Sequence, residues 1–436
     1  MMEYLPLFDL SVIILSGNAT CRDEQFMMLK KAILLATPGD TVTIKMKPCR
    51  QIGVIFFRHD WSGEVRISIG ESQYEVDLYS PLGTNWVAEF LTPMPVGEFT
   101  VEVSLLNRKN SASKSTEAWI QAIYTSDYPT SEIPDLIRQR VEKPPFTQAT
   151  LNQLTDVFKW YDPTWQAAMK IIAPSPTYTP PNFVHRKSWE WVQCAFGLDW
   201  LGAIQPDSRA LGLGTGWEPL SFVFSNHVRE VVATDLYSDG HQWSEAGAKE
   251  GNPDILDNPE KYATVSYRPD HLTFRRMDGR KIDFPDASFD FVWSCSSIEH
   301  FGGHNGAAQS MKEIERVLRP GGIAAIITEY VLPDPVTGMP SLFDPEYFNL
   351  RCLYEYIIQP PKYLRLVQMF DDSIPDYYVR RACQLPEEAD APHHGINKPH
   401  VVLKSPSGAF HTSISLFFRK EGDVKPMITP HIFQFE

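Results

Sequence analysis

The chain has 436 residues, of which 43% are hydrophobic and 22% are charged, and its formal net charge is −14 at pH 7. This length allows two or three domains, and this composition is typical of a globular protein. The acidic balance disfavours nucleic acid as a partner, because phosphate contacts need clustered Lys and Arg. The sequence contains no apolar stretch of the ~20 residues that a membrane helix needs and no basic signal segment at its start, so we expect a cytoplasmic protein without integral membrane association.

The first 127 residues are rich in short β-type runs separated by turn signals. Apolar and polar residues alternate in these runs, which predicts an all-β sandwich. The predicted strands cover residues 40–46, 53–57, 64–69, 74–78, 86–90 and 99–104. The pattern resembles β-sandwich modules of carbohydrate-active proteins, which implies glycan or partner recognition. Trp61, Tyr79 and Trp86 could then stack on sugar rings, although packing in the core or at a sheet edge also accounts for them.

Prolines become frequent over residues 128–182, which we interpret as a connector containing helices over 151–159 and 165–172. From residue 183 to 436, helical and strand patterns alternate. Helices are expected over 185–200, after Glu218 and over 307–318, and strands end near Gly212 and cover 231–234, 272–280, 289–300 and 323–329. This alternation predicts an α/β domain with a doubly wound, Rossmann-like parallel sheet.

Two further strands are expected over residues 363–370 and 409–419, separated by a long loop over residues 371–404. Long loops in compact domains usually carry function, so this loop is predicted to cover the acceptor site or to form a subunit contact. A homo-oligomer is therefore one possible assembly of this chain. The six cysteines, which contain no Cys-x-x-Cys pair, favour free thiols over a zinc site or a disulfide framework.

The most informative motif is the glycine turn over residues 212–216, which follows a predicted strand. Asp235 ends the next strand about twenty residues later, where a carboxylate can accept from ribose hydroxyls. Downstream, Asp278 and Gly279, residues 297–300 (Ser-Ile-Glu-His) and residues 316–322 (Arg-Val-Leu-Arg-Pro-Gly-Gly) follow in order. Together these segments resemble the class I S-adenosylmethionine-dependent methyltransferases over residues 183–335, and in particular bacterial members associated with surface-glycan synthesis.

The resemblance implies S-adenosylmethionine as cofactor. The expected contacts are Gly212, Gly214, Thr215, Gly216, Glu218, Asp235, Leu236, Asp278, Gly279 and Ser296. The glycines would allow close approach of the backbone, Asp235 would accept from the ribose hydroxyls, and Asp278 would accept from the adenine amino group. Leu236 and Ile282 could sandwich the adenine or simply belong to the core.

One position departs from the family pattern. Many members carry an acidic residue two positions before the first glycine, and here that residue is Ala210. Glu218 could supply the missing carboxylate for the cofactor's charged end. It could instead cap the following helix, where a carboxylate favours the positive end of the dipole.

For catalysis the resemblance points to the end of the fourth strand. His300 is the candidate base for a hydroxyl acceptor, and Glu299 could orient its imidazole or contact the cofactor. His304, Glu329, Tyr330 and Arg186 are candidate substrate contacts. A metal pair formed by His300 and His304 is disfavoured, since Gly302 and Gly303 make a shared helix unfavourable.

The bases at residues 185–187 could close over the cofactor, bind an anionic glycan, or lie on the solvated surface. The function expected from all these features is O-methylation of a saccharide or glycan-linked hydroxyl by in-line methyl transfer. Methylation of a small natural-product hydroxyl or amine is an alternative within enzymes. A catalytically silent glycan-binding scaffold is the alternative outside them, because a fold alone does not supply the acceptor.

Overall fold

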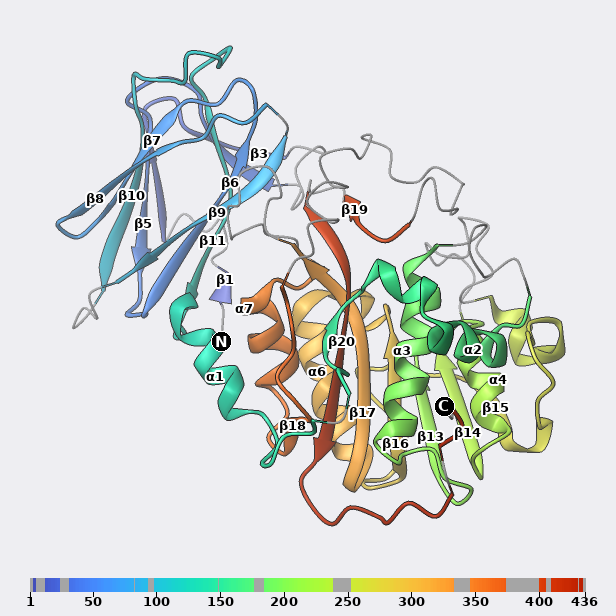
Figure 1. The fold of residues 1–436 in the computed structure, drawn as a ribbon. Helices are drawn as coiled ribbons and strands as arrows, with labels where there is room; N and C mark the ends of the chain where they lie inside the picture. Colours follow the sequence, from blue (N-terminus) through green and yellow to red (C-terminus); the bar gives the residue numbers. More distant parts are fainter. Residues whose placement is uncertain are drawn as a thin grey trace. The chain divides into compact units, whose positions relative to one another are not determined.

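The structure is a computed structural model of the chain (Figure 1), and it describes residues 3–4, 12–23, 31–81, 83–92, 98–147, 149–175, 184–237, 252–332, 346–373, 400–404, 409–429 and 431–433. Two compact units are present. The first comprises Met1–Pro134, Val331–Pro345 and Lys404–Phe410, and the second comprises Asp135–Tyr330, Glu346–Leu403 and His411–Glu436. Residues 135–175 of the predicted connector thus belong to the second unit. The boundaries predicted at 127/128 and 182/183 stay predictions.

Two antiparallel sheets make up the first unit. One has the strand order β3-β4-β11-β6-β9 with β1 beside β11, and the other has the order β2-β5-β10-β7-β8. The strands are β1 (Glu3–Tyr4), β2 (Ile13–Ser16), β3 (Thr20–Asp23), β4 (Lys31–Leu35), β5 (Thr41–Met46), β6 (Gln51–Arg58), β7 (Glu64–Ile69), β8 (Ser72–Asp77), β9 (Thr84–Leu91), β10 (Phe99–Leu105) and β11 (Ala118–Ser126). The short helix η1 (Thr130–Glu132) follows and leads into α1 (Ile133–Gln139).

One hydrophobic cluster joins the inner faces of both sheets. Alternate residues of β7, Val65, Ile67 and Ile69, are buried, and β6 of the other sheet contributes Val54 and Phe56. This period of two is the pattern of a strand that buries one face. The six predicted strands correspond to β5 through β10, whereas β11 was not anticipated, although it lies between β4 and β6.

The predicted helix over residues 151–159 is wrong. The structure has strand β12 (Gln153–Leu154) and the 3₁₀ helix η2 (Val157–Tyr161) there. Gln153 and Leu154 pair antiparallel with β20 (Phe410–Lys420), and Asp156 caps η2 by accepting a hydrogen bond from the backbone N–H of Phe158. Pairing with a distant strand therefore overrides the local helical spacing. The other predicted helix is confirmed as α2 (Pro163–Ile172).

A single large sheet organises the second unit. Its order is β12-β20-β17-β16-β13-β14-β15, with β18 and β19 beside β20. The strands not yet named are β13 (Arg209–Leu213), β14 (Glu230–Asp235), β15 (Leu272–Arg276), β16 (Phe289–Cys295), β17 (Leu318–Val331), β18 (Leu364–Leu366) and β19 (Leu403–Lys404). Strands β13 to β17 pair in parallel, whereas β18 pairs antiparallel with β20. The predicted α/β, Rossmann-like sheet is confirmed for this part of the chain.

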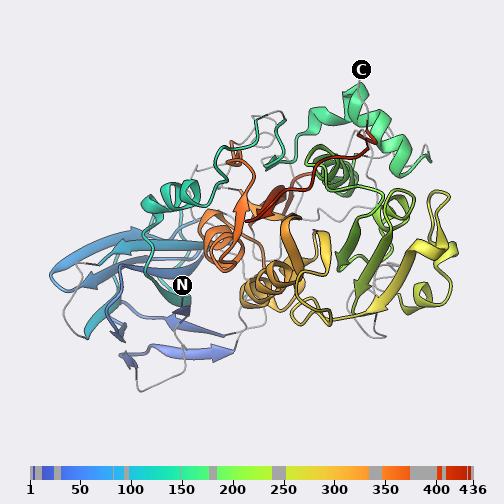
Figure 2. The ribbon, with the colours of Figure 1, turned by 90° about the horizontal axis from the view of Figure 1, so that it is seen from below.

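Helices lie on both sides of this sheet (Figure 2). The helices of the second unit not yet named are α3 (Arg186–Trp200), α4 (Pro219–Ser225), α6 (Gly303–Val317), α7 (Leu350–Cys352) and the π-helix η8 (Leu353–Ile358), and the 3₁₀ turns are η4 (Pro253–Leu256), η5 (Pro259–Lys261), η6 (Pro269–His271) and η7 (Ile298–His300). Helix α6 begins before the predicted start at residue 307, because Gly302 adopts φ +96° and turns the chain into the helix.

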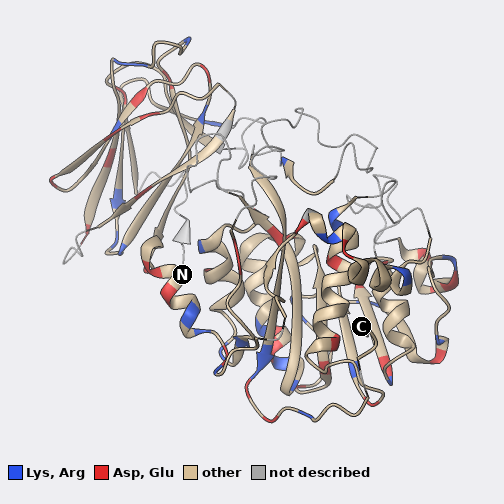
Figure 3. Ribbon diagram, viewed as in Figure 1, with Lys and Arg blue, Asp and Glu red and all other residues tan. Residues whose placement is uncertain are grey.

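Strand β13 lies between β14 and β16, so the strand order reverses beside it. In open parallel sheets, ligands bind in the crevice at the carboxyl ends of the strands at such a reversal. Figure 3 shows Lys and Arg interspersed with Asp and Glu along the ribbon. Within the part of the chain that the structure describes, no helix is long and apolar enough to cross a membrane.

Candidate functional site

A cavity of about 520 Å³ lies at the carboxyl ends of β13, β14, β16 and β17. Most of the predicted site residues line it. They are Arg186, Gly214, Thr215, Gly216, Glu218, Asp235, Leu236, Asp278, Gly279, Ser296, His300 and Glu329. Gly212, Glu299, His304 and Tyr330 are not part of its lining. The fold therefore brings residues from six separate segments to one cavity.

Residues of the glycine turn line this cavity. Gly214 and Gly216 have φ values of +65° and +47°, which side chains rarely adopt. A Cβ on Gly214 would lie 2.5 Å from Cβ of Ser297. The backbone N–H of Thr215 donates to the carbonyl of Thr234 at 3.0 Å, which holds the turn against β14.

Gly212 was predicted to approach the cofactor, but it lies inside β13. A Cβ there would overlap the indole of Trp293, so the glycine makes room for that ring. Ala210 lies two residues earlier in the same strand and is fully buried. Of the three glycines of the motif, Gly214 and Gly216 therefore line the cavity and Gly212 does not.

Two carboxylates face the cavity from the ends of β14 and β15. Asp235 accepts hydrogen bonds from the backbone N–H groups of Gly216 at 3.0 Å and Leu236 at 2.6 Å. Asp278 pairs with the guanidinium of Arg280 at 2.7 Å, and this hydrogen bond lowers the pKa of Asp278. Leu236 is 45% exposed and lines the cavity, and its contact with the ligand stays a prediction. Ile282, in contrast, is buried in the core.

Glu218 occupies the N-cap position of α4, yet its carboxylate makes no capping hydrogen bond. Instead the carboxylate of Glu218, which lines the cavity, accepts a hydrogen bond from Nε1 of Trp293. Burial raises the pKa of Glu218 to about 8. The hypothesis that this side chain caps α4 is thus wrong. The other hypothesis, a carboxyl group facing the cofactor cavity, stays a prediction.

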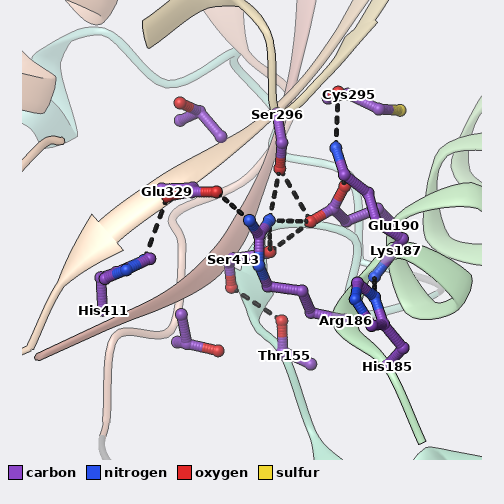
Figure 4. Close-up of polar contacts among 12 residues, drawn as sticks. Thr155, His185, Arg186, Lys187, Glu190, Cys295, Ser296, Glu329, His411 and Ser413 are labelled. Atoms are coloured by element: carbon purple, nitrogen blue, oxygen red, sulfur yellow. Dashed lines mark hydrogen bonds and ion pairs between the residues drawn. The ribbon is translucent and has the colours of Figure 1, made fainter. Parts of the chain in front are cut away.

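A buried ionic network lies beside the cavity (Figure 4). Nη1 of Arg186 lies 2.7 Å from Oε1 of Glu190 and 2.9 Å from Oγ of Ser296, and the same guanidinium pairs with Glu329. Oε2 of Glu329 lies 3.1 Å from Nδ1 of His411. Burial alone would raise the pKa of Glu329, but the charge of Arg186 and the bond with His411 hold it well below its ordinary value. Glu329 is therefore ionised, and Arg186 is not a solvated surface residue.

His185 and Lys187 flank this arginine. Nδ1 of His185 accepts from the backbone N–H of Lys187 at 3.1 Å and so caps α3. The His185 ring stacks on His400, with centroids 4.0 Å apart and planes 12° apart. Nζ of Lys187 lies 3.3 Å from Oε2 of Glu190. All three bases at residues 185–187 line the cavity.

His300 reaches the cavity from η7. Its Nδ1 lies 3.4 Å from Oε2 of Glu346. Burial lowers the pKa of His300, but the interaction with Glu346 and the charges of Glu299 and Glu329 outweigh burial and raise it. Glu299 is fully buried, accepts from Oγ1 of Thr328 at 2.8 Å, and has a pKa raised by burial to about 7. The carboxylate beside Nδ1 of His300 is therefore that of Glu346.

His304 and Tyr330 have other partners. A ring nitrogen of His304 lies 3.0 Å from the carbonyl of Tyr347, and the ring stacks on Tyr356. The hydroxyl of Tyr330 lies 3.2 Å from Oδ2 of Asp372. Both side chains are buried outside the cavity, so their predicted contact with substrate has no support in the geometry. Across the described ranges, no cluster of three or more His, Cys, Asp or Glu residues suits a metal ion.

Comparison with known proteins identifies this part of the chain. Residues 210–326 match the family described as Methyltransferase domain. These residues form an S-adenosylmethionine-dependent methyltransferase domain. The 27-O-demethylrifamycin SV methyltransferase of Amycolatopsis mediterranei (strain S699) is 35% identical over 133 residues, which are 30% of this chain and 42% of that protein. Methyltransferase GfsG of Streptomyces halstedii is 36% identical over 73 residues, 16% of this chain and 25% of that protein.

The chain thus spans less than half the length of these two curated relatives. Among solved structures, a phosphoethanolamine N-methyltransferase 2 of Haemonchus contortus in complex with S-adenosyl-L-methionine is similar to 70% of this chain and 64% of that chain. Its sequence identity is 15% and its TM-score 0.36.

The cofactor of the methyltransferase domain is S-adenosylmethionine, and the cavity fits it in size and chemistry. Ligand cavities usually measure ~300–1,000 Å³. The turn at Gly214 and Gly216 allows close approach of a ligand, and Asp235 and Asp278 offer acceptors for hydroxyl and amino donors. The carboxyl of Glu218 supplies a further acceptor at the other side of the turn.

Sequence reasoning missed several residues that line the cavity of the methyltransferase domain. They are Trp191, Trp217, Tyr237, Met277, Arg280, Cys295, Ser297, Phe301, Gly302 and His400. Most of them are neighbours of motif residues, and this adjacency is the signal that could have found them. His400 had no such signal, because a backbone bridge to His185 brings it to the cavity from the far end of the predicted loop over residues 371–404. Residues 374–399 of that loop lie outside the described residues.

Replacing Asp235 should weaken binding of S-adenosylmethionine. We expect Asp235→Ala to lose ~1.5–3 kcal/mol of binding free energy, measured by calorimetry, because hydrogen bonds to a charged acceptor contribute about this much. Asp235→Asn is the matched control, since its amide oxygen still accepts from the N–H of Gly216 and should retain part of the affinity. Equal affinity of wild type and the alanine variant would contradict this role.

Proposed function

We propose that the protein transfers the methyl group of S-adenosylmethionine to a hydroxyl of a saccharide or of a glycan-linked acceptor. The proposal rests on the position of His300. This residue lines the same cavity as the proposed cofactor contacts, and the Glu346 carboxylate lies at its Nδ1. A hydroxyl must lose its proton as it is methylated, so it requires a base at the acceptor position. A carboxylate at Nδ1 keeps the proton on that nitrogen and leaves Nε2 as the basic atom.

Bound S-adenosylmethionine supplies a methyl group on a positively charged sulfur, which is already activated for displacement. In this proposal Asp235 and Asp278 bind the nucleoside and Glu218 binds the ammonium group. Nε2 of His300 accepts the proton of the acceptor hydroxyl, and Glu346 stabilises the imidazolium that results. The other contribution of the protein is alignment, because holding two reactants in line removes much of the entropic barrier.

The charges of the cavity support an uncharged acceptor. The cations at its lining, within the described part of the chain, each have a carboxylate partner: Arg186 pairs with Glu190 and Glu329, Lys187 with Glu190, and Arg280 with Asp278. An anionic acceptor would have to compete with these carboxylates for each cation. This favours a neutral sugar hydroxyl over the anionic glycan that residues 185–187 suggested. Arg186 then acts by holding Glu329 in place at the cavity wall.

We also infer that the two sheets of the first unit form a β-sandwich that recognises the acceptor glycan. Trp61 is 40% exposed, and its ring lies against His59 with centroids 4.1 Å apart. An aromatic face held in this way suits stacking on a sugar ring. Trp86 packs on Phe56 under the guanidinium of Arg58, which accounts for that side chain by packing alone.

A second candidate acceptor is a small natural-product alcohol. The name of the Amycolatopsis relative, 27-O-demethylrifamycin SV methyltransferase, gives 27-O-demethylrifamycin SV as the acceptor of that protein. Transfer of labelled methyl from S-adenosylmethionine separates the possibilities. The test panel contains neutral oligosaccharides, neutral polysaccharides, uronic-acid polymers and small natural-product alcohols. We expect label in the neutral saccharides; label in the small alcohols alone would favour the second candidate, and no transfer to any of them would favour a silent scaffold.

His300→Ala should reduce kcat by ~10²–10⁴, the usual contribution of a general base. Cofactor affinity should stay unchanged, because the imidazole is proposed to serve the acceptor. His271→Ala is the matched control, since that histidine bonds to the carbonyl of Val228 outside the cavity. Unimpaired turnover in the His300 variant would remove it as the base.

The rate should rise with pH through a pKa above the ordinary histidine value. The base is the neutral imidazole, and Glu346 raises the pKa of His300, so the neutral form dominates only at higher pH. Glu346→Gln removes the negative charge at Nδ1 and should move the rising limb of the kcat profile to lower pH while decreasing its plateau. An unchanged limb in this variant would contradict the pairing.

Trp61→Ala should weaken binding to the acceptor polysaccharide by ~1–3 kcal/mol, the contribution that an aromatic face makes in stacking on ligands. Affinity for S-adenosylmethionine should not change. Tyr74→Ala, which removes another exposed aromatic ring of the first unit, provides the comparison. Affinity electrophoresis in polysaccharide gels measures both variants, and equal retention of wild type and the Trp61 variant would refute the recognition role.

A further inference from the structure

Glu218 is a carboxyl group that is buried in the wall of the cavity. Its backbone N–H donates to the carbonyl of Thr215 at 2.9 Å, which fixes the residue directly after the glycine turn. Its side chain accepts from Nε1 of Trp293, an uncharged donor. Trp293 in turn packs edge-on against Phe224, with centroids 5.1 Å apart, and occupies the space that Gly212 leaves. The carboxyl is therefore held in one place by a rigid aromatic partner.

The charges around Glu218 do not favour its ionised form. Asp235 on β14 and Glu190 on α3 are carboxylates that oppose a further negative charge, and both act on this group. Lys187 on α3 acts in the opposite direction, but its ammonium already lies 3.3 Å from Glu190. Among the residues that the structure describes, the other titratable neighbours are Tyr237, Cys194 and Cys295, and each is itself buried. Within the described ranges Glu218 has no ion-pair partner of its own, so the buried carboxyl keeps its proton, and burial raises its pKa to about 8.

A cation placed against this carboxyl reverses the balance, because an opposite charge within a few ångströms favours the ionised form. The methionine end of S-adenosylmethionine carries such a cation, an α-ammonium group. This inference rests on the cofactor site proposed above. We propose that Glu218 releases its proton to solvent when the cofactor's ammonium group binds, so that the neutral carboxyl becomes the carboxylate of an ion pair. One O–H bond breaks, one proton leaves to the buffer, and no other bond changes.

The proposal predicts how affinity depends on pH. Below the pKa of Glu218 in the empty site, binding costs the removal of a proton, so affinity should increase about tenfold per pH unit. An α-amino group has an ordinary pKa of ~7.7–8.0 and loses its charge above this range. Affinity should therefore rise from pH 6 to 7.5 and fall again in more alkaline solution.

Other groups in the cavity could also release protons. His185, His300 and His400 line it and would respond to the positive sulfur of the cofactor. Two ligands separate these sources from Glu218. S-adenosylhomocysteine keeps the ammonium group but lacks the positive sulfur, whereas 5′-methylthioadenosine lacks the whole amino-acid end. Proton release that occurs with S-adenosylhomocysteine but not with 5′-methylthioadenosine depends on the ammonium group and is therefore assigned to Glu218.

Calorimetry of the full chain in phosphate and in imidazole buffer at pH 6.5 measures the protons released on binding. Wild type should release close to one proton with S-adenosylhomocysteine and almost none with 5′-methylthioadenosine. Glu218→Gln keeps an acceptor for Nε1 of Trp293 but cannot ionise. It should release almost no proton, and its affinity for S-adenosylhomocysteine should change less than twofold between pH 6 and 7, where wild type gains about tenfold.

Equal release with the two ligands in wild type would overturn the proposal, even if the glutamine variant did not fold. Undiminished release in a folded glutamine variant would overturn it as well. These measurements need no methyl acceptor. Failure of O-methylation with intact proton release would therefore refute the proposed function alone, and loss of proton release with normal turnover would refute this inference alone.

Discussion

The buried guanidinium of Arg186 is the interaction on which the site depends. It comes from the first turn of α3 and meets Glu190 of the same helix, Ser296 after β16 and Glu329 on β17 (Figure 4). Removing one member of a buried ion pair usually costs ~3–5 kcal/mol, because the remaining charge loses its partner. The helix that precedes the glycine turn is therefore tied to the strand ends that carry the candidate base.

This network separates the carboxyl groups of the site into different protonation states. Glu329 pairs with a cation, and the charge of Arg186 together with His411 lowers its pKa in spite of burial. In the described part of the chain, Glu299 and Glu218 are buried without such an ion-pair partner, so burial raises their pKa values to about 7 and about 8. Groups whose pKa values are pushed apart by their surroundings can serve different roles in one cavity. Ionised Glu329 stabilises the wall, while a neutral carboxyl can exchange its proton.

The local parts of the site could be predicted from the sequence because they depend on neighbours in the chain. A glycine turn after a strand, Asp235 at the end of the next strand and Asp278 after the third all reach the cavity, because parallel strands place their carboxyl ends at one edge. The same reasoning failed where a distant segment decides the structure. Residues 151–159 have helical spacing but pair in part with β20. Gly212 makes room for the ring of Trp293 and does not line the cavity.

The sequence by itself determined the α/β class, the methyltransferase domain and its cofactor, because strand periodicity and glycine turns are properties of short segments. The tertiary structure decided the partners of the charged groups. Only folding places Glu346 beside His300, His400 against His185 and Trp293 against Glu218. Protonation depends on burial and on charges within a few ångströms, and residues that lie far apart in the chain supply both.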